Sequence, residues 1–382
     1  MKQTCMTILA LALVVAGCTN KKVSTTTDGE ANDSTAVVEA DAGDDKQGEE
    51  VYSLEGIAKA IKGARMVTPF REGRASVVIN DKLGVIDKMG HVIVPFEYDY
   101  SVMTYSEGIL CAHKGETKIY LDRDGKELFT MEDCSPGEFH EGLACISKDG
   151  KNGFIDKTGK VVIPFEWEWA QNFSDGRAIV MKEGERYGFI DKTGKVVIPC
   201  KYEIPAEQNP TNFSEGLCPV MMDSNHEYYG YINTDGEQVI PKLFPWNNDF
   251  HEGLADVYDS ETHLYGYIDK TGKMVITLEE NWNGDAFHEG VALTRGPSEY
   301  AFIDKTGKKL FTVDYKGVEP FSEGLARVFD GEKYGFIDKT GKLVIPCEHT
   351  CYDNFSEGLV PIHQGGKEGY MDKTGKTTFD FE

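Results

Sequence analysis

The chain has 382 residues, enough for two or three ordinary domains or for one long repeat array. Acidic side chains outnumber basic ones by 64 to 40, which gives a formal charge of −24. Such a surface repels nucleic-acid phosphates and offers no polybasic patch to a membrane, so we exclude nucleic acid and an electrostatic membrane surface as partners. Aromatic residues make up 11% of the chain and are spread along it, which predicts that most of it folds.

Residues 1–17 are typical of a signal peptide. Lys2 carries the positive charge, and an apolar run of 11 residues follows from Met6 to Ala16. This run is too short for a membrane-spanning helix, which needs about 20 residues. The run ends in Val15-Ala16-Gly17-Cys18, which resembles the lipobox of bacterial lipoproteins. The resemblance implies cleavage before Cys18 and lipidation of Cys18, and an ordinary signal peptide is the alternative.

Residues 18–50 are predicted to be the lipidated Cys and an acidic, disordered tether. Residues 19–50 contain nine acidic residues and no aromatic one, so they cannot form a core. By resemblance to enterobacterial lipoproteins, Thr19 implies the outer membrane of a Gram-negative envelope. The absence of an early acidic cluster favours the periplasmic face, with the cell surface as alternative. Residues 51–65 are predicted to form a short cap, in which Ser53 precedes Leu54 and Ile57 at helical spacing.

Residues 66–382 repeat one unit nine times. The string G-F-I-D-K-T-G-K recurs with spacings of 35, 34, 35, 42, 36, 35, 34 and 34 residues. A second string, F-S-E-G-L, precedes each copy. The Asp position of the first string falls at Asp87, Asp122, Asp156, Asp191, Asn233, Asp269, Asp304, Asp338 and Asp372. Nine repeats in one phase leave no room for a separate catalytic domain.

The sequence of each repeat predicts three antiparallel strands. After the F-S-E-G turn, buried-type residues such as Ala75 and Val77 alternate with a freely varying position, which predicts a strand with one buried face. The D-K-T-G segment predicts a tight hairpin with a three-residue loop, since Asp accepts backbone N–H bonds and Gly adopts positive φ. A third strand is predicted to end at Pro or Thr. We therefore expect an all-β array of three-stranded antiparallel meanders, in which neighbouring repeats stack.

The pattern (aromatic)-G-(Phe/Tyr)-I-D-x-x-G-K-x-V-I-P, followed by F-S-E-G-L-A, resembles the bacterial WG-repeat family. The resemblance covers residues 66–382, although Tyr replaces the family's Trp before Gly in several repeats, as at Tyr187 and Tyr334. It implies a binding or scaffolding module. Propeller blades usually have four strands and occur in rings of four to eight, whereas this unit is shorter and occurs nine times. We therefore expect an open or spiral array, with a propeller-like ring as the alternative.

The recurring acids favour a structural role. Every F-S-E-G turn carries one acidic residue, and a residue that recurs nine times is best explained by a structural problem that recurs nine times. Calcium binding and acid–base catalysis are the alternatives. Cys347 and Cys351 suggest a disulfide or a metal site, but Cys347 and Cys200 occupy an apolar repeat position, which favours buried thiols. We predict no catalytic residue, no metal site and no cofactor.

Departures from the repeat are the better candidates for binding. Extra residues occur near 204–210 and 223–229, and insertions in repeat arrays often form the binding face. Trp169, Trp246 and Trp282 lie in the loop before F-S-E-G beside acids or amides, an arrangement that suits a sugar or a protein partner. The competing interpretation is that they fill loop cores.

These observations predict a lipid-anchored, non-enzymatic β-repeat protein that presents an acidic surface to a protein partner of the cell envelope, one of basic charge. A glycan-binding module that uses the loop tryptophans is the first alternative. An envelope hydrolase is the second, and it would need a unique acidic pair that breaks the repeat symmetry.

Overall fold

The computed structural model describes residues 51–381 except for 100–104, 183–185, 204–211 and 223–227. The predicted signal peptide, Cys18 and the tether therefore lie outside the described residues, as do most positions of the two predicted insertions. Residues 49–382 form one compact unit. Among the described residues, no helix combines the length and the apolar character that a membrane span requires.

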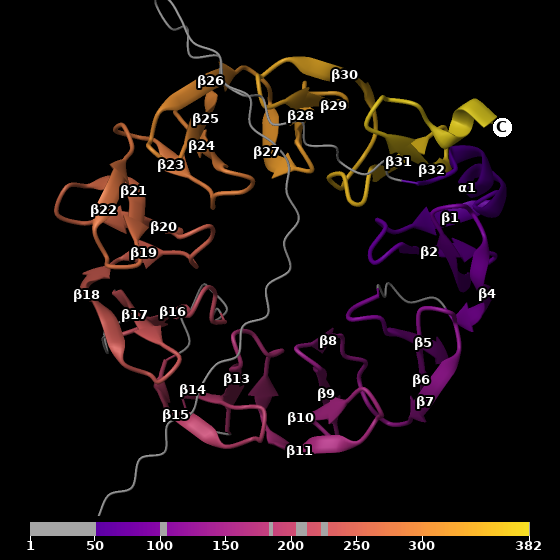
Figure 1. Ribbon diagram of the computed structural model, residues 1–382, viewed down its shortest axis with the longest axis horizontal. Coiled ribbons are helices and arrows are strands. Elements are labelled where there is room, and N and C mark those ends of the chain that lie inside the picture. Colours follow the sequence, from indigo (N-terminus) through magenta and orange to yellow (C-terminus); the bar gives the residue numbers. More distant parts are fainter. Residues whose placement is uncertain (1–50, 100–104, 183–185, 204–211, 223–227, 382) are drawn as a thin grey trace, which may run out of the picture. The chain divides into compact units, whose positions relative to one another are not determined.

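The unit consists of small antiparallel sheets whose strands pair in chain order (Figure 1). The first sheet contains β1 (Ala64–Val67), β2 (Arg74–Ile79), β3 (Lys82–Asp87), β4 (Val92–Asp99), β5 (Leu110–Lys114), β6 (Thr117–Leu121) and β7 (Glu127–Met131). The next two sheets contain β8 (Phe139–His140), β9 (Leu143–Lys148), β10 (Lys151–Asp156) and β11 (Val161–Trp167), and then β12 (Trp169–Ala170), β13 (Ala178–Met181), β14 (Tyr187–Ile190) and β15 (Val196–Tyr202).

The remaining sheets continue the same order. They contain β16 (Leu217–Met221), β17 (Tyr229–Asn233) and β18 (Gln238–Phe244), then β19 (Trp246–Asn247), β20 (Leu254–Asp259), β21 (Leu264–Asp269) and β22 (Met274–Thr277), then β23 (Asn283–Gly284), β24 (Val291–Arg295), β25 (Tyr300–Asp304) and β26 (Lys309–Val313). The last two contain β27 (Gly317–Ser322), β28 (Leu325–Phe329), β29 (Tyr334–Asp338) and β30 (Leu343–His349), and then β31 (Leu359–Gln364) and β32 (Lys367–Asp372).

The predicted D-K-T-G hairpin loop is confirmed. In the third repeat, Gly159 N donates to Asp156 O at 2.9 Å, and the Asp156 carboxylate accepts from the backbone N–H groups of Thr158 and Lys160. Gly159 has a φ of +81°, a conformation that favours glycine because it has no Cβ. The carboxylate thus satisfies the backbone donors of the loop that joins two strands.

A short additional strand corrects the prediction of three strands per repeat. The segment before F-S-E-G returns beside the strand that follows the turn, so that Trp169 pairs with Met181 and Trp246 pairs with Tyr258. Four-stranded sheets result in several repeats. Sequence patterns missed these strands because two residues are too few to show alternation.

Where the third strand contains Pro it does not end there as predicted, whereas β22 ends at Thr277 as predicted. β11 runs through Pro164, and its pairing with β10 shifts register between Ile163 and Trp167. In Figure 1, β11, β15 and β30 lie on the outer side of their sheets, where one edge has no neighbouring strand. An outer edge combined with a register shift tolerates a residue that lacks an N–H group.

The prediction of one buried strand face is also wrong. At the freely varying position, Ser76, Cys111, Ile179 and Asp256 are all buried. Both faces of the central strands are covered because each sheet packs against the sheets of the repeats before and after it. The varying position therefore lies between adjacent repeats, where each pair of neighbours has its own packing.

The expectation of an open array is wrong, because the last repeat contacts the first (Figure 1). Tyr370 Oη donates to Thr68 O at 2.7 Å, and Ser356 Oγ donates to Phe70 O at 2.6 Å. The Glu357 carboxylate accepts from Gly73 N at 2.8 Å. The array therefore closes into a propeller-like ring through side chains and does not require exchange of a strand.

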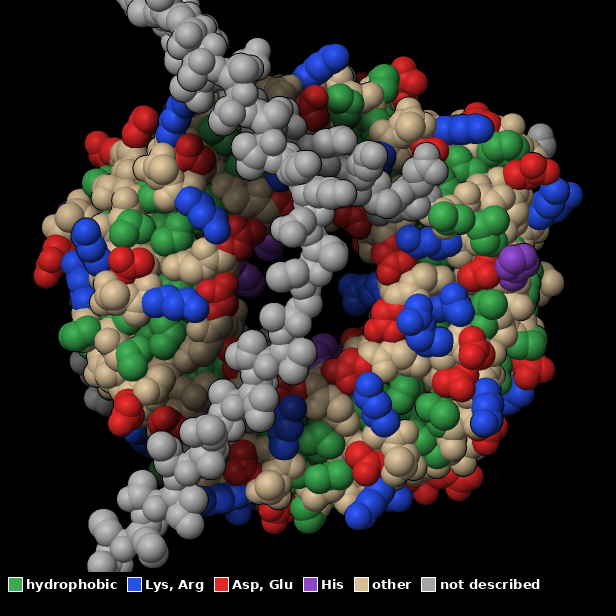
Figure 2. Space-filling model, in the orientation of Figure 1, with side chains coloured by type: hydrophobic (Ala, Val, Ile, Leu, Met, Phe, Trp, Pro, Cys, Tyr) green, Lys and Arg blue, Asp and Glu red, His purple; other side chains and the backbone are tan. Residues whose placement is uncertain are grey.

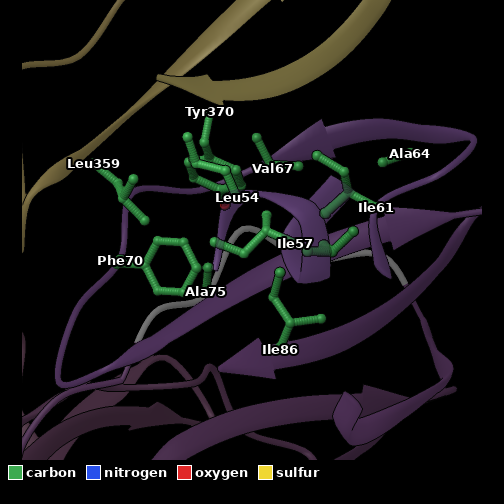
Figure 3. Close-up of a cluster of buried hydrophobic side chains, with 11 residues drawn as sticks. Leu54, Ile57, Ile61, Ala64, Val67, Phe70, Ala75, Ile86, Leu359 and Tyr370 are labelled. Carbon is green, nitrogen blue, oxygen red and sulfur yellow. The ribbon is translucent and has the colours of Figure 1, made fainter. Parts of the chain in front are cut away.

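A hydrophobic cluster lies at this junction (Figure 3). The helix α1 (Leu54–Ala60), whose N-terminus is capped by the Ser53 hydroxyl, buries Leu54 and Ile57 in the cluster. Leu359 and Tyr370 of the last repeat pack in the same cluster. The short 3-10 helix η1 (Thr378–Phe381) contacts α1, so the two ends of the described unit lie together.

We predict that loss of the Glu357 carboxylate weakens ring closure. Glu357→Ala should lower the free energy of unfolding by about 1–3 kcal/mol, because the Gly73 N–H loses a charged acceptor. Glu357→Gln retains an acceptor oxygen, so it should lower the free energy of unfolding by less. Urea unfolding measures both variants, with Glu280→Ala at an exposed position as control. Equal stability of Glu357→Ala and the control would contradict this role.

Candidate functional site

The nine F-S-E-G segments form tight turns that we call the turn ring. In each turn the acidic residue and the glycine both have positive φ, as in Glu107 (+50°) and Gly108 (+82°), which is the geometry of a two-residue type I′ hairpin. The acidic residues are Glu72, Glu107, Glu141, Asp175, Glu215, Glu252, Glu289, Glu323 and Glu357. A left-handed conformation is unfavourable for Glu, which indicates that the side chain itself is needed there.

That side chain joins each repeat to the next. Every turn carboxylate accepts a hydrogen bond from the glycine N–H of the following turn, at 2.7 to 3.0 Å. The pairs are Glu72–Gly108, Glu107–Gly142, Glu141–Gly176, Asp175–Gly216, Glu215–Gly253, Glu252–Gly290, Glu289–Gly324, Glu323–Gly358 and Glu357–Gly73. The hydrogen bonds form a closed cycle, since the last acid binds the first glycine.

Lysines of the D-K-T-G loops neutralise most of these acids. Seven turn carboxylates have a lysine Nζ at 2.9 to 3.3 Å. Burial alone would raise the pKa of Glu107, but hydrogen bonds from Lys157 and from Gly142 N–H lower it overall. Figure 2 shows Asp and Glu side chains around the central opening, with Lys and Arg among them. The turn carboxylates are therefore held in place by hydrogen bonds and, in seven turns, by an ion pair with a lysine.

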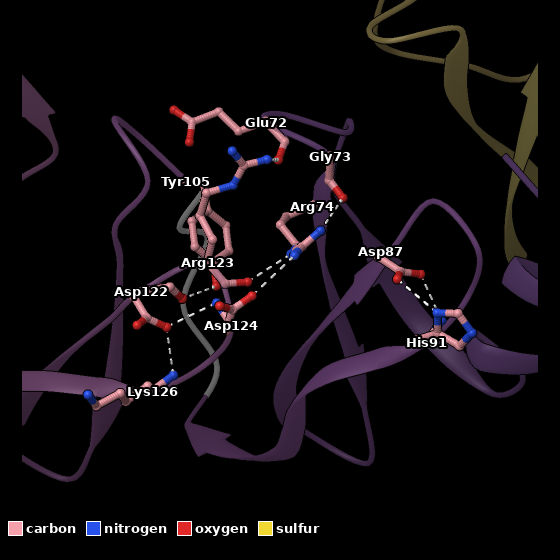
Figure 4. A network of polar contacts seen from close by, with 10 residues as sticks. All are labelled: Glu72, Gly73, Arg74, Asp87, His91, Tyr105, Asp122, Arg123, Asp124 and Lys126. Atoms are coloured by element: carbon pink, nitrogen blue, oxygen red, sulfur yellow. Dashed lines mark hydrogen bonds and ion pairs between the residues drawn. The ribbon is translucent and has the colours of Figure 1, made fainter. Parts of the chain in front are cut away.

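Arginine replaces the loop lysine in the second repeat (Figure 4). The Arg123 guanidinium donates to Glu72 O at 2.5 Å, and Arg74 Nε donates to Arg123 O at 2.9 Å. Tyr105 Oη donates to Asp122 O at 3.0 Å. An arginine thus contacts the turn acid here where a lysine does so in other repeats. This supports the predicted structural role of the recurring acids.

The histidines that replace Ser in F-S-E-G lie on the turn ring. The rings of His251 and His288, from adjacent repeats, are 5.8 Å apart between centroids. His140 belongs to the third repeat, where its Nε2 lies 3.9 Å from a Glu138 oxygen. In five other turns Ser donates to the backbone of the next repeat, as Ser174 Oγ does to Phe213 O at 2.6 Å, and the first turn has Arg71 at this position.

The three predicted binding tryptophans belong to different repeats. Trp169 and Trp246 are half-buried in the short strands β12 and β19, and Trp246 packs edge-on against Tyr265. Trp282, directly before β23, is only 7% exposed, with Lys309 Nζ 4.2 Å from its ring centroid. Each tryptophan contributes to the packing of its own sheet, and the structure does not assemble them into one aromatic platform.

The seven cysteines of the described residues are free thiols. Cys218 and Cys351 are buried, and burial raises the pKa of Cys351 to about 11 and that of Cys145 to about 12. Within the described residues, Cys347 and Cys351 form no disulfide, and no group of three His, Cys, Asp or Glu side chains is arranged to hold a metal ion.

Asp256 is an acid that the repeat pattern does not explain. It occupies the varying position between sheets and is 2% exposed, with its carboxylate accepting from Asn248 Nδ2 at 2.9 Å. Burial raises the pKa of Asp256 to about 7, and the nearby carboxylates of Asp285 and Asp249 add to the effect. The sequence alone placed this side chain at a solvent-facing position, so its burial was missed.

We predict that Asp256→Asn stabilises the protein in a pH-dependent way. Below the ordinary pKa of 3.8, both the folded and the unfolded protein hold the Asp256 proton, so the variant and the wild type should be equally stable. As the pH rises toward about 7, Asp256 ionises freely only in the unfolded state. The free energy of unfolding of the wild type should therefore fall, by up to roughly 4 kcal/mol relative to that of the variant.

Thermal unfolding at about pH 4 and about pH 8 measures this difference. The Tm of Asp256→Asn should exceed that of the wild type only at the higher pH. Asp314→Asn, at an exposed position, should have the same Tm as the wild type at both pH values. A Tm offset that does not change with pH would contradict a neutral, buried Asp256.

Solved structures with a similar fold share little sequence with this chain. A eukaryotic initiation factor matches with a TM-score of 0.54 and 11% identity, over 73% of this chain and 86% of that chain. The computationally designed Ika8 protein (TM-score 0.41, 12% identity, 74% and 95% covered) and BamB from Moraxella catarrhalis (0.40, 11%, 69% and 92%) are more distant. At this identity the initiation factor supports the fold alone. No curated protein matches the sequence.

The family comparison rests on the repeats themselves. The model described as "WG containing repeat" matches residues 84–116, 153–185, 187–225, 229–258, 265–280, 300–334 and 334–367, together more than half of the chain. These segments include seven of the nine D-K-T-G hairpin loops and the third strands that follow those seven. The chain therefore belongs to the WG-repeat family.

Proposed function

We propose that the chain is a lipid-anchored, non-catalytic binding protein of a Gram-negative cell envelope, and that its nine-repeat ring presents an acidic surface to a protein partner. Lipidation at Cys18 and the tether of residues 18–50 would attach the ring to the periplasmic face of the outer membrane. Several acyl chains supply a stable anchor, since each buried CH₂ contributes roughly 0.8 kcal/mol.

The closed turn ring is the observation that carries this proposal. Its nine carboxylates bind glycine N–H groups of neighbouring repeats, and seven also pair with lysines, so they hold a rigid platform and are not free to transfer protons. The chain nevertheless has 64 acidic and 40 basic residues, so the 55 acids outside the turn ring (64 − 9) still outnumber all the basic residues. A rigid acidic platform suits recognition of a basic partner.

Crosslinking mass spectrometry on native envelopes tests the proposal. With the protein at its natural level, we expect one dominant protein to be crosslinked to the ring. Sparse crosslinks to many abundant proteins would contradict a specific scaffold.

Salt and tryptophan variants separate a protein partner from a glycan. Binding to a basic protein should weaken steeply between about 0.05 M and 0.2 M salt, because ions screen the attraction. Trp169→Ala and Trp246→Ala should then have little effect. Affinity that ignores salt and falls in both tryptophan variants, measured by calorimetry, would favour a glycan-binding module.

A further inference from the structure

Two histidine rings lie next to each other on the turn ring. His251 and His288 occupy the Ser position of F-S-E-G in adjacent repeats, and their ring centroids are 5.8 Å apart. The two residues are 37 positions apart in the chain, so only the packing of one repeat on the next brings them together. Among the described residues, no other two histidine rings are in contact.

The two imidazoles give up the contact that Ser makes at this position. In five turns the Ser hydroxyl donates to the backbone of the next repeat, whereas neither imidazole forms a hydrogen bond or an ion pair within the part of the chain that the structure describes. His288 is exposed and His251 is half-buried, so water and ions reach both rings. Figure 2 shows histidine side chains at the central opening. The ring nitrogens are therefore available to a ligand from solution.

The spacing of the rings matches that of two ligands of one metal ion. Zinc binds a histidine nitrogen at about 2.0–2.1 Å, so two imidazoles bound to one ion have ring centroids roughly 5–6 Å apart. The observed 5.8 Å lies within that range. The ring planes are inclined by 38°, and rotation of these accessible side chains between rotamers can turn one nitrogen of each ring toward a common point.

The surroundings tolerate a cation but supply no third protein ligand. Glu252 and Glu289, the turn acids that follow the two histidines, each bind a glycine N–H and a lysine. These acids balance the charge of those lysines, and we count neither acid as a ligand. The net charge of −24 raises the concentration of dications near the protein surface. Water fills the remaining positions of such an ion, as it does in zinc sites that keep an open position.

We propose that His251 and His288 together bind one transition-metal dication of the kind that prefers imidazole ligands, such as Zn²⁺. The inference does not depend on the proposed function. Because the protein supplies two ligands, the ion keeps positions at which a carboxylate or an imidazole of another molecule can displace water. The turn ring then carries an exchangeable metal ion at one junction between repeats.

Titration calorimetry with Zn²⁺ and the full-length protein tests the pair. The wild type should bind one ion per chain, and His251→Ser and His288→Ser should each weaken binding at least about tenfold, since even the loss of an indirect partner of a metal ligand costs that much. Both variants should fold, because Ser occupies this position in five other turns. The matched control is His140→Ser, where the adjacent turns carry Ser106 and Ser174, and it should bind Zn²⁺ as tightly as the wild type.

Chemical modification of the wild type gives a second readout that needs no variant. Diethyl pyrocarbonate acylates imidazole nitrogens, and a bound metal ion blocks this reaction. Zn²⁺ should therefore protect His251 and His288 together and leave His140 reactive, which mass spectrometry of the peptides measures.

Four results would overturn the assignment. They are the absence of Zn²⁺ binding, binding that either Ser variant of the pair retains in full, an equal loss in His140→Ser, and protection of one histidine of the pair without the other. None of these results bears on the crosslinking test of the protein partner, so failure of the metal site and failure of the proposed function are separate outcomes.

Discussion

The hydrogen bond from a turn glycine to the carboxylate of the preceding repeat is the interaction on which the ring depends. It requires Glu in a left-handed conformation that costs of order 1–3 kcal/mol, and the charged hydrogen bond and the lysine ion pair offset that cost. A unit of this size cannot bury its own sheet, so it needs neighbours. The bond Glu357–Gly73 supplies the neighbour that an open array would lack at its ends.

This use of the recurring acids limits where function can reside. A carboxylate that binds both an N–H group and a lysine is fixed in place, so its role is to set the geometry of the ring. Positions that differ between repeats are free of that constraint. Asp256, buried between sheets, and the histidine pair at His251 and His288 are two such departures, and of these only the histidine pair is accessible to water.

Much of the fold was predictable from local patterns. The D-K-T-G loop around Asp156 was recognised because its conformation is set within five residues, and the structural role of the turn acids was inferred from their recurrence. The short strands at Trp169 and Trp246 were missed because two residues show no periodicity. The burial of Asp256 was missed because alternation within one strand cannot report a second sheet packed on its outer face.

The candidate metal site was not predictable in the same way. The histidines of the turns are visible in the sequence, but a site at His251 and His288 depends on two repeats lying side by side. The sequence by itself determined the repeat unit, its turns, its all-β character and its family, because each depends on residues close together in the chain. Only the tertiary structure decided that the array closes, which charges are paired, and which histidines meet. Those properties depend on the angle between neighbouring sheets and on contacts between distant residues.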